Sequence, residues 1–167
     1  TPMGARLIKK WIMQPLLDKE AIEKRLNSVE ELTKKIVLKQ EIAEQLDKMY
    51  DIERIVSRIN LGCGNARDLL ALKNSLTWIP MIKNALLLAE SEMLQELASV
   101  ETSQELVYLL ESAIAEDAPV SIREGNMIKR GFSTELDELQ NICKNGKTYI
   151  RDLEMKEQEK TGIKTLK

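Results

Sequence analysis

The chain has 167 residues and a formal net charge of −2, with 43% apolar and 31% charged residues. This length suits one domain, and the balance of apolar and charged residues excludes a disordered chain. It contains only 7 Gly and 4 Pro residues, and its apolar residues are mostly Leu, Ile, Met and Ala, which favour helices over strands. The composition therefore predicts an all-α protein.

Membrane and secretion classes are also excluded by the sequence. The longest stretch without a charged residue, 74–82, has nine residues and contains Pro80, so it is too short to span a bilayer. Lys9 and Lys10 lie inside the first apolar run, which does not fit a secretion signal. We therefore expect a cytoplasmic protein with no membrane contact.

Helical spacing of apolar residues dominates the first third of the chain. A first helix is expected over 3–13, and it should end before Pro15, because the residue before a proline is pushed out of the helical conformation. Asp18 is predicted to cap a long helical stretch over 21–50. That stretch is interpreted either as one helix or as two helices joined near 37–40.

Shorter helices are expected in the middle of the chain. Asp51 is predicted to cap one that ends at the glycines of "LGCGNARD", residues 61–68. The next helix restarts within this stretch and meets Pro80, which should interrupt or bend it. Further helices are expected over 92–100 and 103–116. Because each helix has one apolar side, they must pack on one another.

Residues 117–132, "DAPVSIREGNMIKRGF", form the clearly irregular part of the sequence, with at most a minor hairpin near residues 120–130. A long helix should then begin at Ser133 or Thr134. Apolar or small residues follow a 3-4-3-4-3 spacing within it, the pattern of a helix–helix seam. These seam residues are Leu136, Leu139, Cys143, Gly146, Ile150 and Leu153.

The helix is expected to continue after its seam has ended. The same register places Glu157 and Lys160 at the next two seam positions, yet helix-favouring residues continue until Thr161-Gly162 stops them. A helix over 133–160 would be roughly 42 Å long at 1.5 Å per residue. A polar helical extension of this kind indicates a projecting arm that contacts protein outside this chain.

A search for chemistry assigns no catalytic, cofactor-binding or metal-binding residue. The chain contains no His, and it has no phosphate-binding loop. Cys63 and Cys143 lie outside any disulfide or zinc spacing and are expected to be ordinary packed or half-packed thiols. The segment "EGNMIKRG" is interpreted as a connector, with an anion cradle using Lys129 and Arg130 as the alternative. No carboxylate is expected in an apolar pocket.

The charge is unevenly distributed along the chain. Residues 1–13 and residues 144–167 each carry a net charge of +3, so the remainder carries −8. A polyanionic partner would therefore meet an end of the chain rather than its middle. The alternative is that these charged side chains simply face solvent on the helix surfaces and bind no partner.

Four stretches of the sequence stand out together, namely "TPMGARLIKKWIMQPL", "SRINLGCGNARDLLALKNSL", "IREGNMIKRGFSTELDEL" and "EKTGIKTLK". Together they resemble the core, or lever, domain of the MutS family of DNA mismatch-repair proteins. Their order and spacing agree along essentially the whole chain, although Asn126 stands where the family pattern has a second glycine.

The resemblance implies an elongated helical bundle with a helical core over 1–132 and a long lever helix over 133–167, which runs toward a clamp domain outside this chain. It also implies a parent protein that binds mismatched double-stranded DNA, forms a homodimer, uses ATP and Mg²⁺ in a separate ATPase domain and engages a MutL-like repair protein. This fragment would be a lever and scaffold without catalysis of its own. Lysines on the arm or its tip would lie near DNA phosphates, namely Lys156, Lys160, Lys164 and Lys167.

Two other functions are considered from the residues alone. A stand-alone helical protein–protein interaction module would use the seam of residues 136–153 as an intermolecular coiled coil. An enzyme acting alone is the least supported, because the search for chemistry finds no catalytic set.

Overall fold

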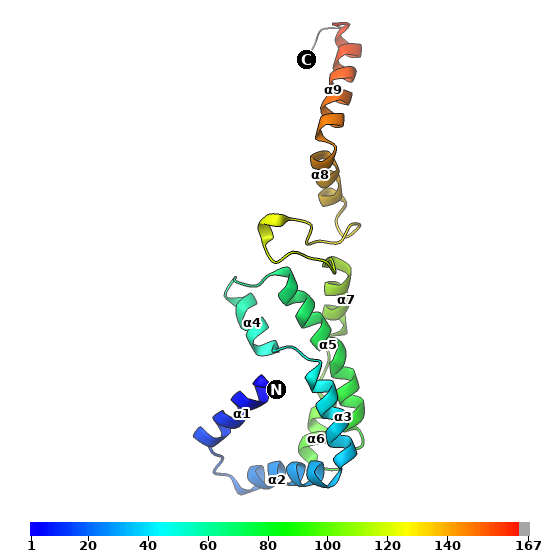
Figure 1. Cartoon of the computed structure of the whole chain (residues 1–167). Coiled ribbons are helices and arrows are strands. Elements are labelled where there is room, and N and C mark those ends of the chain that lie inside the picture. The colour runs from blue at the N-terminus through cyan, green and yellow to red at the C-terminus, as the bar shows by residue number, and fades with distance from the viewer. Residues whose placement is uncertain (164–167) are drawn as a thin grey trace. The chain divides into compact units, whose positions relative to one another are not determined.

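The computed structural model describes residues 1–163 and is shown in Figure 1. All regular elements within this range are helices, and no β-strand forms there, which confirms the all-α prediction. The chain divides into two compact units, Thr1–Met127 and Ile128–Lys167, the second of which is described as far as residue 163.

The first unit is built around one long helix, α5 (Ala66–Leu86), which packs against α3, α4, α6 and α7. The other helices of this unit are α1 (Pro2–Met13), α2 (Lys19–Lys34), α3 (Ile36–Asp47), α4 (Ile52–Asn60), α6 (Glu92–Ser99), α7 (Gln104–Ala113) and the short 3-10 helix η1 (Ile122–Glu124). The irregular segment of the sequence therefore contains one helical turn, and the Ala115 N–H donates to the Met127 oxygen at 2.9 Å, which agrees with the expectation of at most a minor hairpin.

The main core cluster lies where α3, the end of α5 and α6 meet. Alanine is frequent in it, and small side chains let helix backbones approach closely. Its buried members are Leu38, Ala85, Leu86, Ala89, Leu94 and Ala98, with Leu32, Ile42 and Ile82 packed against them. This cluster is the interior toward which the apolar sides of α2, α3, α5 and α6 turn.

Polar side chains begin several helices as the sequence predicts. Asp18 accepts a hydrogen bond from the backbone N–H of Ala21 at 2.8 Å, and Ser133 accepts one from Leu136 at 3.3 Å. Asn65 forms a reciprocal capping box with Asp68 at the start of α5. Each cap satisfies backbone donors that have no partner inside the helix.

Two helix boundaries differ from the sequence-based prediction. The stretch over 21–50 breaks at Lys35, with φ −91° and ψ 71°, and not near 37–40. The Lys35 side chain at this break forms ion pairs with Glu31 and Glu90. The helix α5 continues through Pro80, because packing on several neighbouring helices outweighs the lost backbone hydrogen bond.

The second unit contains α8 (Thr134–Lys144) and α9 (Gly146–Thr161), which follow one another with a break at Asn145. Asn145 has φ −105° and ψ 20°, and the expected single helix over 133–160 is interrupted there. Asn and Gly both have low helix propensity, which explains why the break falls at this pair. The helix α9 ends at Gly162, whose φ of 71° is left-handed, so the predicted stop is confirmed.

Candidate functional site

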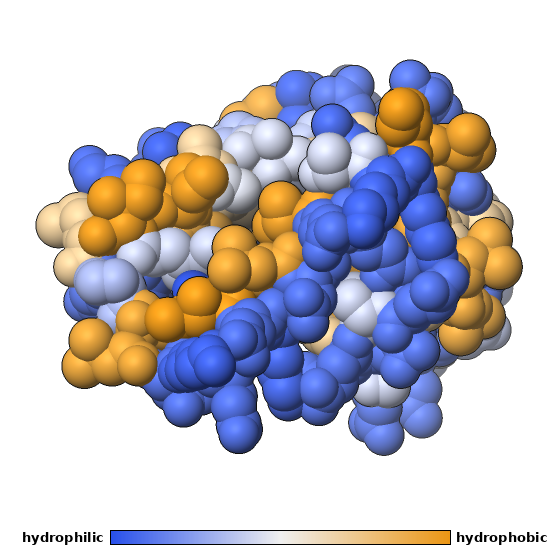
Figure 2. All heavy atoms as spheres, turned by 90° about the horizontal axis from the view of Figure 1, so that it is seen from below, coloured by the Kyte–Doolittle hydropathy of each residue, from blue (hydrophilic) through white to orange (hydrophobic). Residues whose placement is uncertain are grey.

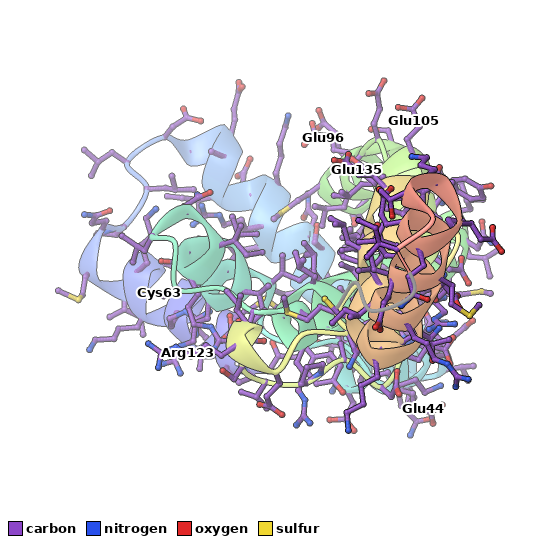
Figure 3. All side chains as sticks on the ribbon, turned by 90° about the horizontal axis from the view of Figure 1, so that it is seen from above. Glu44, Cys63, Glu96, Glu105, Arg123 and Glu135 are labelled. Atoms are coloured by element: carbon purple, nitrogen blue, oxygen red, sulfur yellow. The ribbon has the colours of Figure 1, made fainter. Side chains whose placement is uncertain are left out.

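The described residues offer no centre for metal chemistry. No group of three or more His, Cys, Asp or Glu side chains within residues 1–163 is placed to hold a metal ion. Cys63, in the loop between α4 and α5 (Figure 3), and Cys143, on α8, are both exposed free thiols, so the expectation that they are packed or half-packed is wrong. The part of the chain that the structure covers also lacks any helix with the length and apolarity to cross a bilayer.

The lysines assigned to DNA contact fall on α9 or beyond it. Lys156 and Lys160 are exposed and, being four residues apart, share one side of α9. Lys160 is also within 3.2 Å of the Glu157 carboxylate. Lys164 and Lys167 lie outside the described residues. The assignment of these four lysines to DNA contact therefore stays a prediction.

The helix α9 is electrically balanced along its length. Its four basic residues are Lys147, Arg151, Lys156 and Lys160, and its four acidic residues are Asp152, Glu154, Glu157 and Glu159. The basic residues also fall on different sides, because the five positions from Arg151 to Lys156 turn an α-helix by about 140°. A polyanion would consequently meet short pairs of basic side chains and not one continuous stripe.

The apolar seam of the second unit is largely exposed. Leu139, Ile150 and Leu153 have exposed fractions of 54%, 65% and 49%. Contiguous apolar side chains at helical spacing usually mark a surface that another segment covers. The seam is therefore a candidate contact surface.

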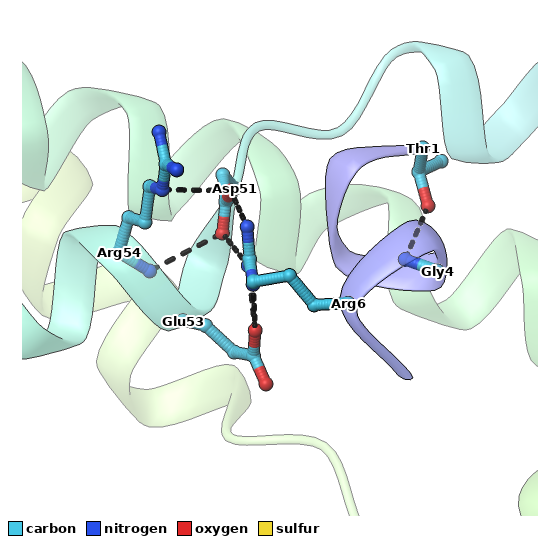
Figure 4. Close-up of polar contacts among 6 residues, drawn as sticks. All are labelled: Thr1, Gly4, Arg6, Asp51, Glu53 and Arg54. Carbon is cyan, nitrogen blue, oxygen red and sulfur yellow. Dashed lines mark hydrogen bonds and ion pairs between the residues drawn. The ribbon is translucent and has the colours of Figure 1, made fainter. Parts of the chain in front are cut away.

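An ion-pair network joins α1 to the start of α4 (Figure 4). The guanidinium of Arg6 donates to both Asp51 oxygens, at 2.8 and 2.6 Å, and to Glu53 at 2.9 and 2.5 Å. Asp51 also accepts the backbone N–H of Arg54 at 3.2 Å, as an N-cap does. Hydrogen bonds to Asp51 and Glu53 raise the pKa of Arg6, and the bond from Arg6 lowers the pKa of Asp51.

A second link joins the end of α4 to the start of α5. Arg58 donates to Asp68, whose other oxygen accepts the backbone N–H of Asn65 at 3.1 Å. Arg67 points its Nε toward the backbone oxygen of Ala118 at 3.3 Å. Arg58, Arg67 and Asp68, which lie in one of the four stretches that resemble MutS, thus hold helices and loops in place.

A third polar cluster surrounds a nearly buried carboxylate, that of Glu31, in a polar and not an apolar setting. The Glu31 side chain on α2 is only 9% exposed and accepts the backbone N–H groups of Glu90 and Ser91, each at 2.7 Å. Burial alone raises the pKa of this carboxyl, but hydrogen bonds from Ser91, Glu90 and Lys35 outweigh it and lower the pKa to about 2. A permanently charged carboxylate of this kind is a structural anchor and not a proton-transfer group.

Sequence reasoning missed the partners of these anchors. It identified Asp51 as a helix cap but did not pair it with Arg6, and it did not single out Glu31 at all. The residues of each pair lie more than forty positions apart, at separations of 45 for Arg6–Asp51 and 60 for Glu31–Ser91. No local pattern in a single sequence reports a contact at that separation.

The structure defines a class of protein: an all-helical protein whose charged anchors position helices and whose second unit presents an exposed apolar seam. The chain belongs to the family described as MutS domain III, whose model matches residues 1–162. It is similar to the DNA mismatch repair protein MutS of Methanosarcina mazei, with 49% identity over 172 aligned residues, and to that of Listeria monocytogenes, with 48% identity over 168. Both alignments cover all of this chain and 19% and 20% of the relatives, so the chain spans about a fifth of their length.

Proposed function

We propose that this chain serves DNA mismatch repair as a lever and scaffold segment of a MutS-type ATPase. In this role it links the parts that bind mismatched DNA and form the clamp to the ATPase domain, and it carries no catalysis itself. The family match over residues 1–162 supports the assignment to mismatch repair. ATP and Mg²⁺ would act elsewhere in the parent protein.

The exposed seam of α8 and α9 is the observation that carries the lever role. After Leu153 the helix continues to Thr161 with predominantly charged residues. Its last turns therefore have no row of apolar side chains that could pack against a neighbour. Charge pairs within a single helix contribute only about 0.2–0.5 kcal/mol each. A second helix along the seam would supply the missing packing and make the pair stiff enough to transmit displacement.

Contact with DNA would be electrostatic and independent of sequence. Lys156 and Lys160 on α9, together with Lys164 and Lys167, are the proposed contacts to phosphates. Because α9 has equal numbers of acidic and basic residues, we expect the isolated chain to bind duplex DNA weakly and to lose that binding as salt rises. The parent would work in the cytoplasm as a homodimer and engage a MutL-like protein.

A chimeric protein tests the lever role. This chain replaces the aligned segment of the Listeria monocytogenes relative, and we expect the chimera to lower the spontaneous mutation rate of a strain without its own MutS. A four-glycine insert after Asn145 should abolish the response of nucleotide hydrolysis to mismatched duplex while leaving hydrolysis without DNA unchanged. The same insert after Cys63, in an exposed loop, is the matched control. An unchanged response with the Asn145 insert would contradict the lever role.

The exposed seam also supports a second candidate, a helical protein–protein interaction module. In that case the isolated chain would form reversible dimers through Leu139 and its neighbours, seen by sedimentation across a concentration series. Loss of the dimer in Leu139→Lys, with helicity unchanged, would favour this module. A chain that stays monomeric at all concentrations would remove it.

A further inference from the structure

The junction between α8 and α9 contains an Asn-Gly pair, Asn145–Gly146. Of the eight asparagines in the sequence, Asn145 is the only one that a glycine follows. Asparagine is a chemically labile residue, because a backbone nitrogen can displace its side-chain amide. A side chain on the following residue hinders that nitrogen, and glycine has none. Asn145 is therefore the asparagine whose side chain its neighbour's nitrogen can attack with least hindrance.

The backbone nitrogen of Gly146 is not held by either helix. Gly146 is the first residue of α9, and the first N–H groups of a helix have no acceptor inside it. The N–H of Asn145 donates to the Asn141 oxygen at 2.9 Å, but no backbone hydrogen bond runs from Gly146 to α8 within the described residues. A Cβ atom at Gly146 would meet open space. The nitrogen is therefore unbonded and uncrowded.

The Asn145 side chain is free to meet this nitrogen. Asn145 is exposed and stands at the N-cap position of α9, yet among the described residues its amide makes no capping hydrogen bond. Asn65, by contrast, accepts the Asp68 N–H at 3.0 Å at the start of α5. Rotation about ψ of Asn145, now 20°, moves the Gly146 nitrogen and releases the Tyr149 N–H from the Asn145 oxygen, a bond of 2.8 Å. A bond at an exposed helix end opens readily.

We propose that Asn145–Gly146 is a site of spontaneous deamidation. The Gly146 nitrogen gives its proton to hydroxide and attacks Cγ of Asn145. The new N–Cγ bond closes a succinimide ring, and the Cγ–Nδ2 bond breaks, so that Nδ2 leaves as ammonia after taking a proton from water. Water then opens the ring on either side of the nitrogen. Cleavage at Cγ gives aspartate, and cleavage at the backbone carbonyl carbon gives isoaspartate, in which the main chain passes through Cγ.

The two products change the α8–α9 junction in opposite directions. Aspartate places a negative charge and a capping acceptor at the start of α9, whose first turn has no acidic residue, so it should strengthen that end. Isoaspartate adds a methylene carbon to the main chain and should displace the bond from the Tyr149 N–H. The junction would therefore change as the molecule ages. The reaction itself does not depend on the proposed lever role.

Asn27 on α2 is the internal control. It is exposed and precedes a small residue, Ser28. The side of the first unit that carries α2 presents many hydrophilic side chains to solvent (Figure 2), so water reaches both asparagines. Asn27 and Ser28, however, lie in the interior of α2, where the Ser28 N–H is part of the helix and its hydroxyl donates to the Lys24 oxygen at 3.0 Å. Deamidation there requires α2 to open in its middle.

Ageing of the complete chain tests the proposal. The chain is incubated at mildly alkaline pH with and without urea, then digested at acidic pH, and deamidation at each asparagine is measured by peptide mass spectrometry. We expect Asn145 to react in the folded chain at nearly its rate in urea. Folding should slow Asn27 about tenfold or more, because helix interiors open less often than helix ends. Comparing each residue with itself in urea removes the difference between Gly and Ser.

Substitutions at the pair provide the matched comparison. Gly146→Ala should slow the reaction severalfold both in the folded chain and in urea, because its methyl group hinders the attack. Gly162→Ala, at the other end of α9, should leave the rate at Asn145 unchanged. Asn145→Asp should slow amide exchange in the first turn of α9. The isoaspartate fraction of the aged chain, separated by ion exchange, should instead show faster exchange there.

Three outcomes would overturn the proposal. Equal protection of Asn145 and Asn27 by folding would mean that the junction holds its peptide as firmly as a helix interior. Faster reaction at another asparagine of the folded chain would place the labile site elsewhere. Unchanged amide exchange in α9 of the isoaspartate fraction would show that the modification leaves the junction as it was.

Discussion

Arg6 on α1 and Asp51 at the start of α4 form a two-point ion pair, with nitrogen–oxygen distances of 2.8 and 2.6 Å. No residue of α1 is buried, so apolar packing contributes little to the position of that helix. The ring of Trp11 adds one contact, with the Arg25 guanidinium 3.8 Å from its centroid. The Arg6–Asp51 pair is therefore the principal contact that fixes α1 against α4.

Removing the Arg6 guanidinium should release α1 from the first unit. We expect Arg6→Ala to speed amide hydrogen exchange severalfold across α1, with little change in α5. Arg6→Lys should have an intermediate effect, because an ammonium cannot bind both Asp51 oxygens in the same fork. Lys9→Ala, which removes an exposed basic side chain of the same helix, is the control and should leave exchange unchanged. Equal exchange in Arg6→Ala and the unmodified chain would mean that other contacts hold α1.

Glu31 should contribute to stability in a pH-dependent way. Glu31→Gln loses the charge that binds two backbone N–H groups and Lys35, at a cost of about 1.5–3 kcal/mol in the free energy of unfolding at pH 7. The pKa of Glu31 is lowered to about 2 from an ordinary 4.5, so its contribution is complete above pH 4.5 and lost as the pH falls toward 2. The difference between the two proteins in urea unfolding should therefore shrink over that range.

Glu30→Gln is the matched control for that experiment. Glu30 lies beside Glu31 on α2, is exposed, and pairs only with Lys34 one turn away among the residues that the structure describes. Its pKa is also lowered, by the hydrogen bond from Lys34, but solvent screens the pair. We expect a smaller loss of stability than in Glu31→Gln. Equal losses in the two variants would contradict the anchoring role of Glu31.

Among the small residues of α5, Ser75 should cost the most stability when it is replaced. Its side chain has an exposed fraction of 0%, accepts the backbone N–H of Tyr50 at 2.9 Å and donates to the Ala71 oxygen at 2.8 Å. Ser75→Ala leaves the Tyr50 N–H without this acceptor and should cost about 1–3 kcal/mol. Thr77→Ala removes a similar bond, to Lys73, from an exposed position and should be close to neutral. Thermal unfolding of the two variants compares them directly.

The sequence predicted most of the helices and their caps but few of the contacts between helices. Caps such as Asp18, Asp51 and Ser133 and the stop at Gly162 act within a few residues, so a single sequence reveals them. The ion pair of Lys35 with Glu90, at the break between α2 and α3, has a separation of 55 residues and could not be read from the sequence. Pro80 was expected to interrupt or bend its helix; α5 is not interrupted there, because tertiary packing outweighs local preference, and a bend at Pro80 stays a prediction.

The candidate site shows the same limit. Apolar spacing located the seam, because a helix repeats its sides every three to four residues. The ion pairs Arg6–Asp51 and Arg58–Asp68 have no such regular spacing, since the two residues of each pair come from different elements. The folding of the chain brings the partners together, and composition cannot report that geometry.

Two glycines at the ends of α9 should respond to alanine in opposite ways. A Cβ atom at Gly146 would meet open space, so Gly146→Ala replaces a poor helix former without a clash and should stabilise the junction by up to about 1 kcal/mol. Gly162 has a φ of +71°, which an alanine adopts only with strain, so Gly162→Ala should destabilise the end of α9 by about 1–2 kcal/mol.

Circular dichroism at 222 nm and amide exchange over 142–160 measure both effects. We expect more helical signal and slower exchange near Asn145 in Gly146→Ala, and faster exchange in the last turn of α9 in Gly162→Ala. Each variant is the control for the other, because both exchange the same residue types in the same helix. If Gly146→Ala leaves the break at Asn145 unchanged, low helix propensity is not its cause, and a contact specific to Asn145 must hold it open.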